Sequence, residues 1–261
     1  MVLAFARPEV NETFPKLWAE RGVVPLPLGA LTKKSGEKLV RELLGSVATP
    51  DVVARIVERA AGNAFYLEEL IRAAAEGRGD DAMPETVLAM VQARLNALEP
   101  EARRVLRAAS VFGQVFWAGG VVALLGGKHD ETQVRDWLSE LVVREVIGAR
   151  PEARFRGEQE FVFRHAIVRE AVYSTLTPAD AALGHGLAAR WLDRAGERDA
   201  VVQAQHLERA GESSRAVEWY IKSAEQALEG NDFDAAVQRA ERGAACGAEG
   251  EVLGHLRLLQ A

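Results

Sequence analysis

The sequence predicts a mainly α-helical protein with little β-structure. Apolar residues recur at helical spacing from about residue 35 onward, and helix-capping residues stand where these runs begin. Short runs of strand character occur at 2–6, 146–149 and 160–164. From residue 179 onward the chain is alanine-rich and helical in pattern. The fold class predicted from these three observations is mainly α.

Composition and charge are those of an ordinary globular protein. A chain of 261 residues suggests about two domains, at roughly 150 residues each. Apolar residues make up 48% and charged residues 27%, which supplies a core. The net charge of −6 disfavours a protein that coats nucleic acid or an acidic membrane. Cys246 is the only cysteine, which excludes an intramolecular disulfide and is typical of a reducing compartment.

The sequence predicts neither a secretion signal nor a membrane span. Residues 1–10 lack the basic segment of a signal peptide and reach Arg7 and Pro8 after a short apolar run. The most apolar stretch, Val111–Gly127, contains five glycines and is shorter than the ~20 residues that cross a bilayer. We therefore expect a cytoplasmic protein that does not enter the membrane.

Residues 1–30 begin with a predicted strand, and residues 31–98 read as a group of helices. Val2–Ala6, ended by Arg7 and Pro8, has the pattern of a buried strand that leaves a sheet. The first three helices are expected to have apolar faces formed by Leu39, Leu43 and Leu44; by Val52, Val53, Ile56, Val57 and Ala60; and by Tyr66, Leu67, Leu70, Ile71 and Ala74.

Cap signals separate these three helices. Ser35 can cap the first, and Thr49 followed by Pro50 marks the start of the second. Gly62 ends the second helix because glycine takes the left-handed conformation without steric cost. Asn63 then caps the third helix. The sequence therefore predicts a tight helix-to-helix corner at Gly62 and Asn63.

A linker and a compact domain are predicted next. Residues 77–84 combine glycine, aspartate and proline, and a further helix with Val87, Val91, Leu95 and Leu98 follows. Residues 99–178 then combine three helices with a two-stranded ribbon around a polar loop, which is the pattern of a winged helix. The elements are helices at Glu101–Ser110, Trp117–Leu125 and Asp130–Arg144, and strands at 146–149 and 160–164.

Residues 179–261 are predicted to form helical hairpins. The stretch 216–247 carries the small residues Ala224 and Ala236, with the aromatic residues Tyr220 and Phe233 between helices. This pattern matches one tetratricopeptide unit, in which small residues permit close helix contact. A helix that follows would expose an apolar stripe, which predicts self-association or a continuation that covers it. The stripe is formed by Val252, Leu253, Leu256 and Leu259.

In this order, the segments resemble the C-terminal portion of STAND-class P-loop NTPases, the signal-transduction ATPases of many bacterial regulators. The resemblance covers nearly the whole chain, and the motifs that carry it lie between residues 6 and 173: ARPE, PLPLGAL, GNAFYLEEL, MPETV with RLNAL, RAASVFG and FRHAIVREAVY. The resemblance implies a remnant of the NTPase α/β core at 1–30, a helical lid at 31–98, a winged-helix domain at 99–178 and helical repeats at 179–261 that bind partner proteins. It also implies an upstream NTPase core and, in some members, an effector domain.

The resemblance implies nucleotide-sensing roles for five residues in a complete protein. Arg7 resembles the sensor arginine at the end of a core strand. Gly62, Asn63 and Ala64 resemble the corner that lies against the nucleotide base, with Ala64 where the family usually has proline. His165 resembles the winged-helix histidine that contacts the β-phosphate of ADP. The residues alone also fit a solvated strand end for Arg7, and a helix stop and start for Gly62 and Asn63. For His165 they fit a helix cap or a hydrogen bond to a buried carbonyl.

The phosphate-binding side of such an NTPase has no counterpart in the sequence. A phosphate loop needs G-x-x-x-x-G-K-[ST], and the nearest match, Gly126–Lys128, is followed by His129 and lacks the upstream glycine. No apolar strand ends in an acidic pair that could hold magnesium. We therefore expect no catalysis and no cofactor in the isolated chain. A complete protein would bind ATP or ADP with magnesium, through a core encoded upstream unless the gene is truncated.

Two other functions fit parts of the sequence. A winged helix suggests a DNA-binding regulator, but the predicted recognition helix, Asp130–Arg144, is more acidic than basic and is repelled by phosphates. Three loop arginines favour DNA, although they also suit a solvated wing or a domain contact: Arg150, Arg154 and Arg156. A pure helical-repeat scaffold is the other alternative. No metal site is expected, because the histidines outside the motifs are scattered: His129, His185, His206 and His255.

Overall fold

The computed structural model describes residues 10, 22, 24, 26–75, 86–126 and 131–260. The chain divides into two compact units, Met1–Met83 and Pro84–Ala261, and the boundary falls within the linker predicted at 77–84. The predicted strand Val2–Ala6, Arg7 and most of the core remnant at 1–30 lie outside the described residues. The linker and His129 lie outside them as well.

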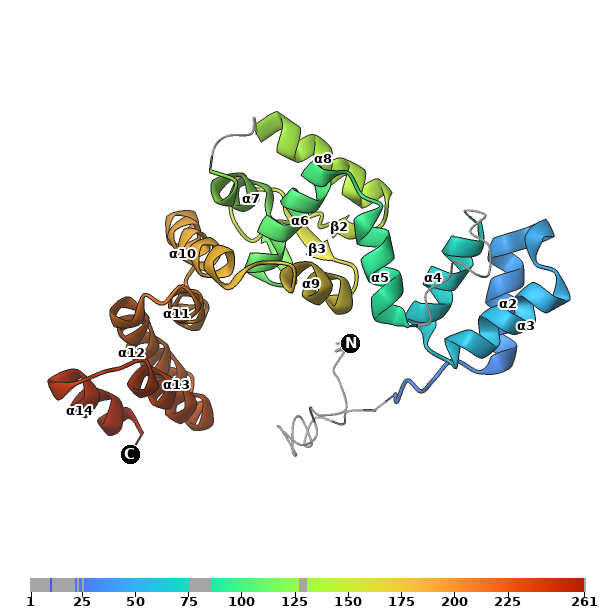
Figure 1. Ribbon diagram of the computed structural model, residues 1–261. Helices are drawn as coiled ribbons and strands as arrows, with labels where there is room; N and C mark the ends of the chain where they lie inside the picture. Colours follow the sequence, from blue (N-terminus) through green and yellow to red (C-terminus); the bar gives the residue numbers. More distant parts are fainter. Residues whose placement is uncertain are drawn as a thin grey trace. The chain divides into compact units, whose positions relative to one another are not determined.

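The described residues are mainly α-helical with one small antiparallel sheet, as the sequence predicts (Figure 1). The first unit contains α2 (Lys33–Leu44), the 3-10 helix η2 (Gly45–Val47), α3 (Pro50–Ala60) and α4 (Ala64–Ala75). The predicted start of α3 is confirmed, because the Thr49 hydroxyl accepts the Val52 N–H at 3.4 Å and Pro50 occupies the first turn.

Helix α2 differs from the prediction in its cap and in its buried face. Thr32, not Ser35, caps the helix, since its hydroxyl accepts the Ser35 N–H at 3.2 Å. The buried face consists of Gly36, Val40 and Leu44, whereas Leu43 is 60% exposed. A Cβ at position 36 would lie 3.4 Å from the Val57 side chain, so glycine lets α2 approach α3 closely. Leu44 is buried as predicted and Leu39 is half-buried, so the prediction is wrong only for Leu43 and in the omission of Gly36 and Val40. Glycine carries no apolar signal, which explains why Gly36 was not placed on the buried face.

The second unit contains the remaining elements (Figure 1). They are α5 (Val87–Asn96), α6 (Pro100–Phe112), β1 (Val115–Trp117), α7 (Ala118–Leu124), α8 (Glu131–Val143), β2 (Ile147–Ala149), β3 (Glu160–Phe163), α9 (Ala166–Tyr173), α10 (Pro178–Ala195), α11 (Ala200–Arg209), α12 (Ser213–Glu229), α13 (Phe233–Ala245) and α14 (Gly250–Leu259). Helix α6 is central and packs against α7, α8, α9 and α10.

The sheet has three strands, one more than the sequence predicts. Its order is β1–β3–β2, with β3 antiparallel to both neighbours. Strand β1 pairs Val115 with Val162 and Trp117 with Glu160, so the predicted helix near Trp117 begins one residue later, at Ala118. Three residues are too few to show the alternating pattern that identifies a strand.

Two predicted domain boundaries do not separate the packed elements. Helix α5 packs against α9 within the second unit, so the range 31–98 crosses the division between the units. Helix α10 packs against α6 and α7 as well as α11, across the boundary predicted at 178. Trp191 of α10 shares a cluster with Trp117 and Phe155. Residues on both sides of position 178 therefore form one core.

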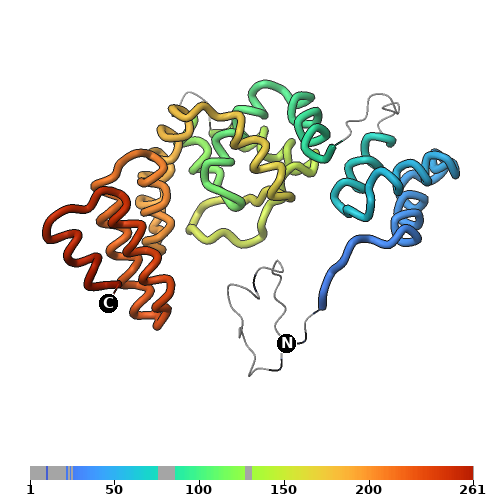
Figure 2. The backbone as a smooth tube through the Cα atoms, turned by 60° about the horizontal axis from the view of Figure 1, so that its bottom comes forward, coloured from blue at the N-terminus to red at the C-terminus, as the bar shows by residue number. Residues whose placement is uncertain are grey.

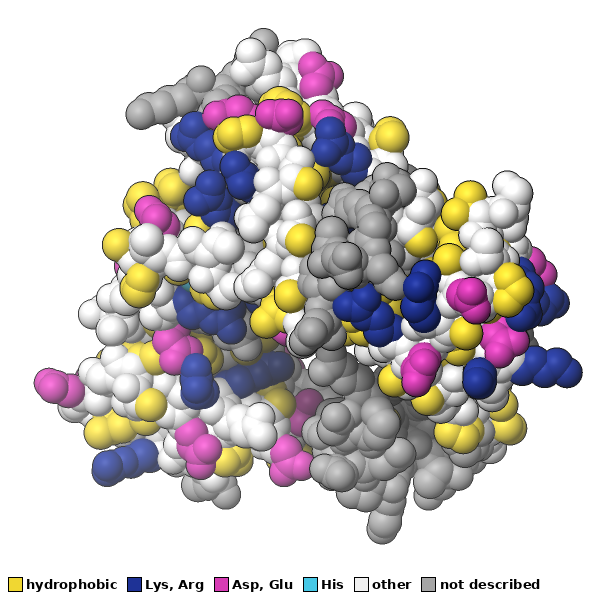
Figure 3. All heavy atoms as spheres, turned by 45° about the vertical axis from the view of Figure 1, so that its right-hand side comes forward, with side chains coloured by type: hydrophobic (Ala, Val, Ile, Leu, Met, Phe, Trp, Pro, Cys, Tyr) yellow, Lys and Arg dark blue, Asp and Glu magenta, His cyan; other side chains and the backbone are white. Residues whose placement is uncertain are grey.

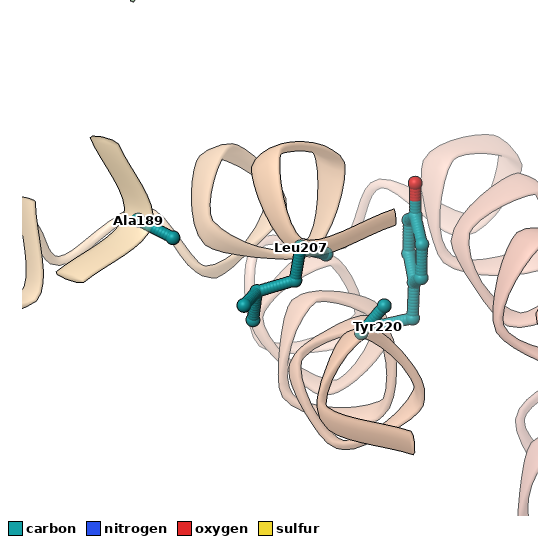
Figure 4. Packing of buried hydrophobic residues seen from close by; sticks show 5 residues of the cluster. Ala189, Leu207 and Tyr220 are labelled. Carbon is teal, nitrogen blue, oxygen red and sulfur yellow. The ribbon is translucent and has the colours of Figure 1, made fainter. Parts of the chain in front are cut away.

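Helices α10 to α14 lie side by side in chain order (orange to red in Figures 1 and 2). Figure 4 shows Ala189, Leu207 and Tyr220, from three successive helices, in one buried cluster. The predicted interhelical position of Phe233 is wrong, because its side chain is 63% exposed at the start of α13. Within the expected terminal stripe, Leu256 is fully buried against α12 and α13, whereas Val252 is 42% exposed.

Replacement of Trp191 by alanine is expected to destabilise the second unit by roughly 3–5 kcal/mol, because it empties an aromatic site in a packed core. Leu183 lies on the same helix but is 61% exposed, so Leu183→Ala is the matched control and should change stability by less than about 0.5 kcal/mol. Hydrogen exchange of the α6 amides measures the opening free energy. Equal effects of the two substitutions would contradict the docking of α10 on α6.

Candidate functional site

The predicted corner between α3 and α4 is present. Helix α3 ends with two left-handed residues, Ala61 (φ 47°) and Gly62 (φ 79°). The Asn63 N–H then donates to the Ala60 carbonyl at 2.8 Å, and the Asn63 Oδ1 accepts the Tyr66 N–H at 3.0 Å. Gly62 as the helix stop and Asn63 as the following cap are therefore confirmed, with Ala61 sharing the left-handed turn.

One side of this corner is occupied by the chain itself. A Cβ on Gly62 would lie 2.9 Å from the Ala30 Cβ and 3.0 Å from the Leu31 carbonyl oxygen. The Leu31 N–H also donates to the Gly62 carbonyl at 2.8 Å. Asn63 and Ala64 are exposed. A ligand at this corner would therefore meet Asn63 and Ala64, while Gly62 serves the close approach of the preceding segment.

His165 stands at the N-cap of α9, directly after the sheet. Its carbonyl accepts the Val168 N–H at 3.1 Å, but its imidazole makes no cap hydrogen bond to the helix. The side chain is half-buried. The alternative in which the imidazole caps α9 is therefore wrong, and the backbone alone supplies the cap geometry.

The predicted sensing residues do not form one site within either unit. Gly62, Asn63 and Ala64 belong to the first unit, His165 belongs to the second, and Arg7 lies outside the described residues. Asn63 and His165 can donate hydrogen bonds to a nucleotide, but an amide and an imidazole do not form the amide nest that cradles phosphates.

Glu160 organises the loop between β2 and β3. Its carboxylate is 3% exposed and accepts hydrogen bonds from Arg150 Nη1 at 2.8 Å, from the Arg154 backbone N–H at 2.8 Å and from Trp117 Nε1 at 2.9 Å. Burial would raise the pKa of Glu160, but these bonds outweigh burial and hold it below its usual value. Glu160 therefore stays ionised and fixes both the loop and the indole.

Arg154 extends this network to the end of α10. Its guanidinium pairs with Glu197, whose side chain is 1% exposed and also accepts the Asp199 N–H at 2.9 Å. The domain contact predicted as one alternative for the loop arginines is therefore correct for Arg154. Arg150 pairs with Glu160, and Arg156 is exposed. Two of the three arginines that favoured DNA thus bind buried carboxylates.

Two histidines that are scattered in the sequence are in contact in the fold. His185 of α10 and His206 of α11 are 0% and 5% exposed, and their Nδ1 atoms lie 2.8 Å apart. The Tyr173 hydroxyl lies 2.7 Å from His185 Nε2, and the Arg169 guanidinium stacks on the Tyr173 ring at 4.4 Å. Arg169 Nε donates to the Ser110 carbonyl at 2.8 Å. A continuous polar chain therefore joins α6, α9, α10 and α11.

Both histidines are held in the neutral form. Burial, with further repulsion from neighbouring cations, lowers the pKa of His185 to about 3 and that of His206 to about 4. Two neutral imidazoles satisfy the Nδ1–Nδ1 contact when one ring donates and the other accepts. The pair lies 21 residues apart on different helices, so no spacing rule in the sequence reveals it.

Acidic and basic side chains are interspersed on the face drawn in Figure 3. Among the described residues, no three His, Cys, Asp or Glu side chains are grouped so that they could hold a metal ion. Of the described helices, none combines the length and the apolar character that a membrane span requires.

Comparison with known proteins adds no family assignment. No protein-family model matches the chain, and no curated protein matches it either. The resemblance to STAND-class NTPases therefore rests on the sequence motifs.

The neutral histidine pair predicts a pH dependence of stability. Because both pKa values are lowered in the fold from an ordinary value of 6.5, the unfolded chain binds protons first as the pH falls. The stabilisation is complete above about pH 6.5 and declines towards pH 4, by up to about 1.4 kcal/mol per pH unit for each histidine.

Urea unfolding at pH 7.5, 6 and 5 measures this loss. The double variant His185→Gln, His206→Gln keeps hydrogen-bonding groups but removes the titration, so its stability should vary less with pH than that of the wild-type chain. An identical pH slope for both proteins would contradict a neutral pair.

Proposed function

We propose that this chain is the regulatory part of a signal-transduction ATPase, as its resemblance to STAND-class NTPases implies. The lid and the winged-helix region sense bound nucleotide, and the helical repeats bind partner proteins. The chain is not catalytic by itself, because its sequence has no phosphate loop and no acidic pair for magnesium. A core in a further segment or chain would hold ATP or ADP with magnesium. A cytoplasmic location fits the single cysteine.

The observation that carries this proposal is the polar connection between α9 and the helical repeats. Helix α9 begins after His165, the residue that resembles a phosphate sensor, and ends at Tyr173. Tyr173 contacts His185 of α10, which in turn contacts His206 of α11. A ligand that favours one position of α9 would therefore act on the repeats through packed and hydrogen-bonded groups.

The repeats themselves have an arrangement that suits partner binding. Glu208 of α11 bonds Arg242 of α13 at 2.7 Å, and these residues are 34 positions apart. This bond joins α11 to α13 across α12, and stacked helices of this kind form extended binding surfaces in tetratricopeptide proteins.

Direct DNA binding has weaker support. Arg150 and Arg154 bind the buried carboxylates of Glu160 and Glu197. On α8, Arg135 pairs with Glu131 at 2.6 Å, and Arg144 beyond its end pairs with Glu140 at 2.5 Å. These ion pairs reduce the positive charge available for phosphates, which supply most of the affinity of DNA-binding proteins.

The test of the proposed function is the effect of His165→Ala in a chain fused to its NTPase core. A hydrogen bond to a charged phosphate is worth ~1.5–3 kcal/mol, so the variant should bind ADP roughly 10- to 100-fold more weakly. Isothermal titration calorimetry measures the affinity. Exposed His255 of α14 is the matched position, and His255→Ala should leave ADP binding unchanged.

Two results would contradict this proposal. One is an unchanged ADP affinity in the fused His165→Ala protein. The other is magnesium-dependent ATPase activity in the isolated chain, which is expected neither to hydrolyse ATP nor to bind ADP measurably.

DNA binding is expected to be absent at physiological salt. Fluorescence anisotropy with double-stranded oligonucleotides of varied sequence should show no saturable complex, because the loop arginines are engaged and α8 is acidic. Sub-micromolar binding that depends on the DNA sequence would instead favour the transcriptional-regulator alternative.

A further inference from the structure

A cavity of about 360 Å³ opens between α11 and α13, with α12 beneath it. Helix α11 lines it with residues at helical spacing, Val201, Gln205, Glu208 and Arg209. Helix α13 lines the other side with Ala235, Gln238, Arg239 and Arg242. Tyr220 of α12 completes the lining. One continuous stripe of each outer helix therefore faces the cavity, which we call the α11–α13 groove.

The groove concentrates positive charge in a chain whose net charge is −6. Three arginines line it against a single carboxylate, that of Glu208. Glu208 already accepts hydrogen bonds from the Tyr220 hydroxyl and from Arg242 Nη2 at 2.7 Å. The cations therefore outnumber the one anion, and that anion is engaged by groups of the groove itself.

Hydrogen bonds hold two of the groove's arginine side chains in place, and these bonds use only some of the N–H donors of each guanidinium. Arg239 Nη1 donates to the Ser223 carbonyl at 2.7 Å, which fixes the side chain against α12. Arg242 is held by Glu208, although its side chain is 62% exposed. A guanidinium has five N–H donors, and these two bonds use one donor on each. Arg209 is exposed at the end of α11.

Two glutamines give the groove groups that can bind a peptide backbone. Gln205 and Gln238 are exposed, one on each wall. A side-chain amide both donates and accepts, as a peptide bond does, so the pair suits an extended main chain lying between the helices. The arginines can then form forked bonds with carboxylates of that segment.

We propose that the α11–α13 groove binds an extended acidic segment of a partner protein, with Arg209, Arg239 and Arg242 pairing with Asp or Glu side chains. This inference rests on the proposed function, in which the repeats bind protein partners, and it names the chemistry of the partner. Gln205 and Glu208 of the groove lie one residue before and two residues after His206, where the polar chain from α9 ends. A segment bound in the groove would therefore lie next to the polar connection that reaches α9.

The test uses the whole chain and a fluorescein-labelled ten-residue peptide of alternating Glu and Ala. Anisotropy should show saturable binding that weakens as salt rises from 50 to 300 mM, because exposed ion pairs are screened. The peptide with Gln in place of Glu should bind at least tenfold more weakly. Equal binding of the Glu and Gln peptides would overturn the proposal.

Charge reversal in the groove provides the residue-level test. Arg209→Glu should weaken binding of the Glu peptide at least tenfold. Arg257→Glu makes the same charge change on exposed α14, outside the groove, and should stay within about twofold of the wild-type affinity. Circular dichroism of both variants establishes that the helices are retained. Arg242→Ala is the second groove variant and should also weaken binding. Equal losses in Arg209→Glu and Arg257→Glu would place the binding elsewhere and overturn the proposal.

A ten-residue oligothymidylate tests whether the groove binds single-stranded nucleic acid instead of an acidic peptide. Preferential binding of this single strand over the Glu peptide, with the same loss in Arg209→Glu, would make the groove a nucleic-acid site and overturn the proposal.

Failure of the peptide to bind would leave the ADP affinity of the fused protein and its dependence on His165 intact. An ADP affinity independent of His165 would instead contradict the proposed function whatever the peptide does.

Discussion

The second unit depends on the packing of Trp191 against the end of the sheet. Its ring stacks on Trp117 at 5.5 Å between centroids and meets Phe155 edge-on at 5.6 Å. These side chains come from α10, β1 and the loop before β3, so a single aromatic cluster joins three segments distant in sequence. The same packing places the end of α10 beside the loop, where Glu197 receives Arg154. The ion pair between Arg154 and Glu197 therefore depends on the apolar packing of Trp191.

Local signals in the sequence were sufficient for the helices and for the corner after α3. Thr49, Gly62 and Asn63 act on their own neighbours, so their roles can be read without knowledge of the fold. Strand β1 could not be read in this way, because its three residues are defined by pairing with β3, far along the chain. Gly36 on the buried face of α2 was missed for a related reason, since it is selected by the nearness of α3.

The candidate site was harder to predict because its residues gain their roles from burial. Arg150 and Arg154 have the same sequence pattern whether they face solvent, DNA or a buried carboxylate. The decisive residues are Glu160 and Glu197, and a glutamate in a short strand or a loop carries no sign that it is buried. His185 and His206 likewise look scattered until α10 and α11 pack together. His165 could be placed at a strand-to-helix junction, because the flanking patterns are local.

The hydrogen-bonded groups from Tyr173 to His206 also provide a route by which a change at α9 would reach α10 and α11. Both imidazoles are buried and neutral, so every ring nitrogen that loses its partner leaves an unsatisfied group, at a cost of about 1–3 kcal/mol. A displacement of α9 that withdrew the Tyr173 hydroxyl would impose this cost on His185 unless α10 moved with it. An apolar contact could slide by small steps, because dispersion has no fixed direction. A directed hydrogen bond between buried groups favours joint movement of α9 and α10, as the proposed transmission from α9 to the repeats requires.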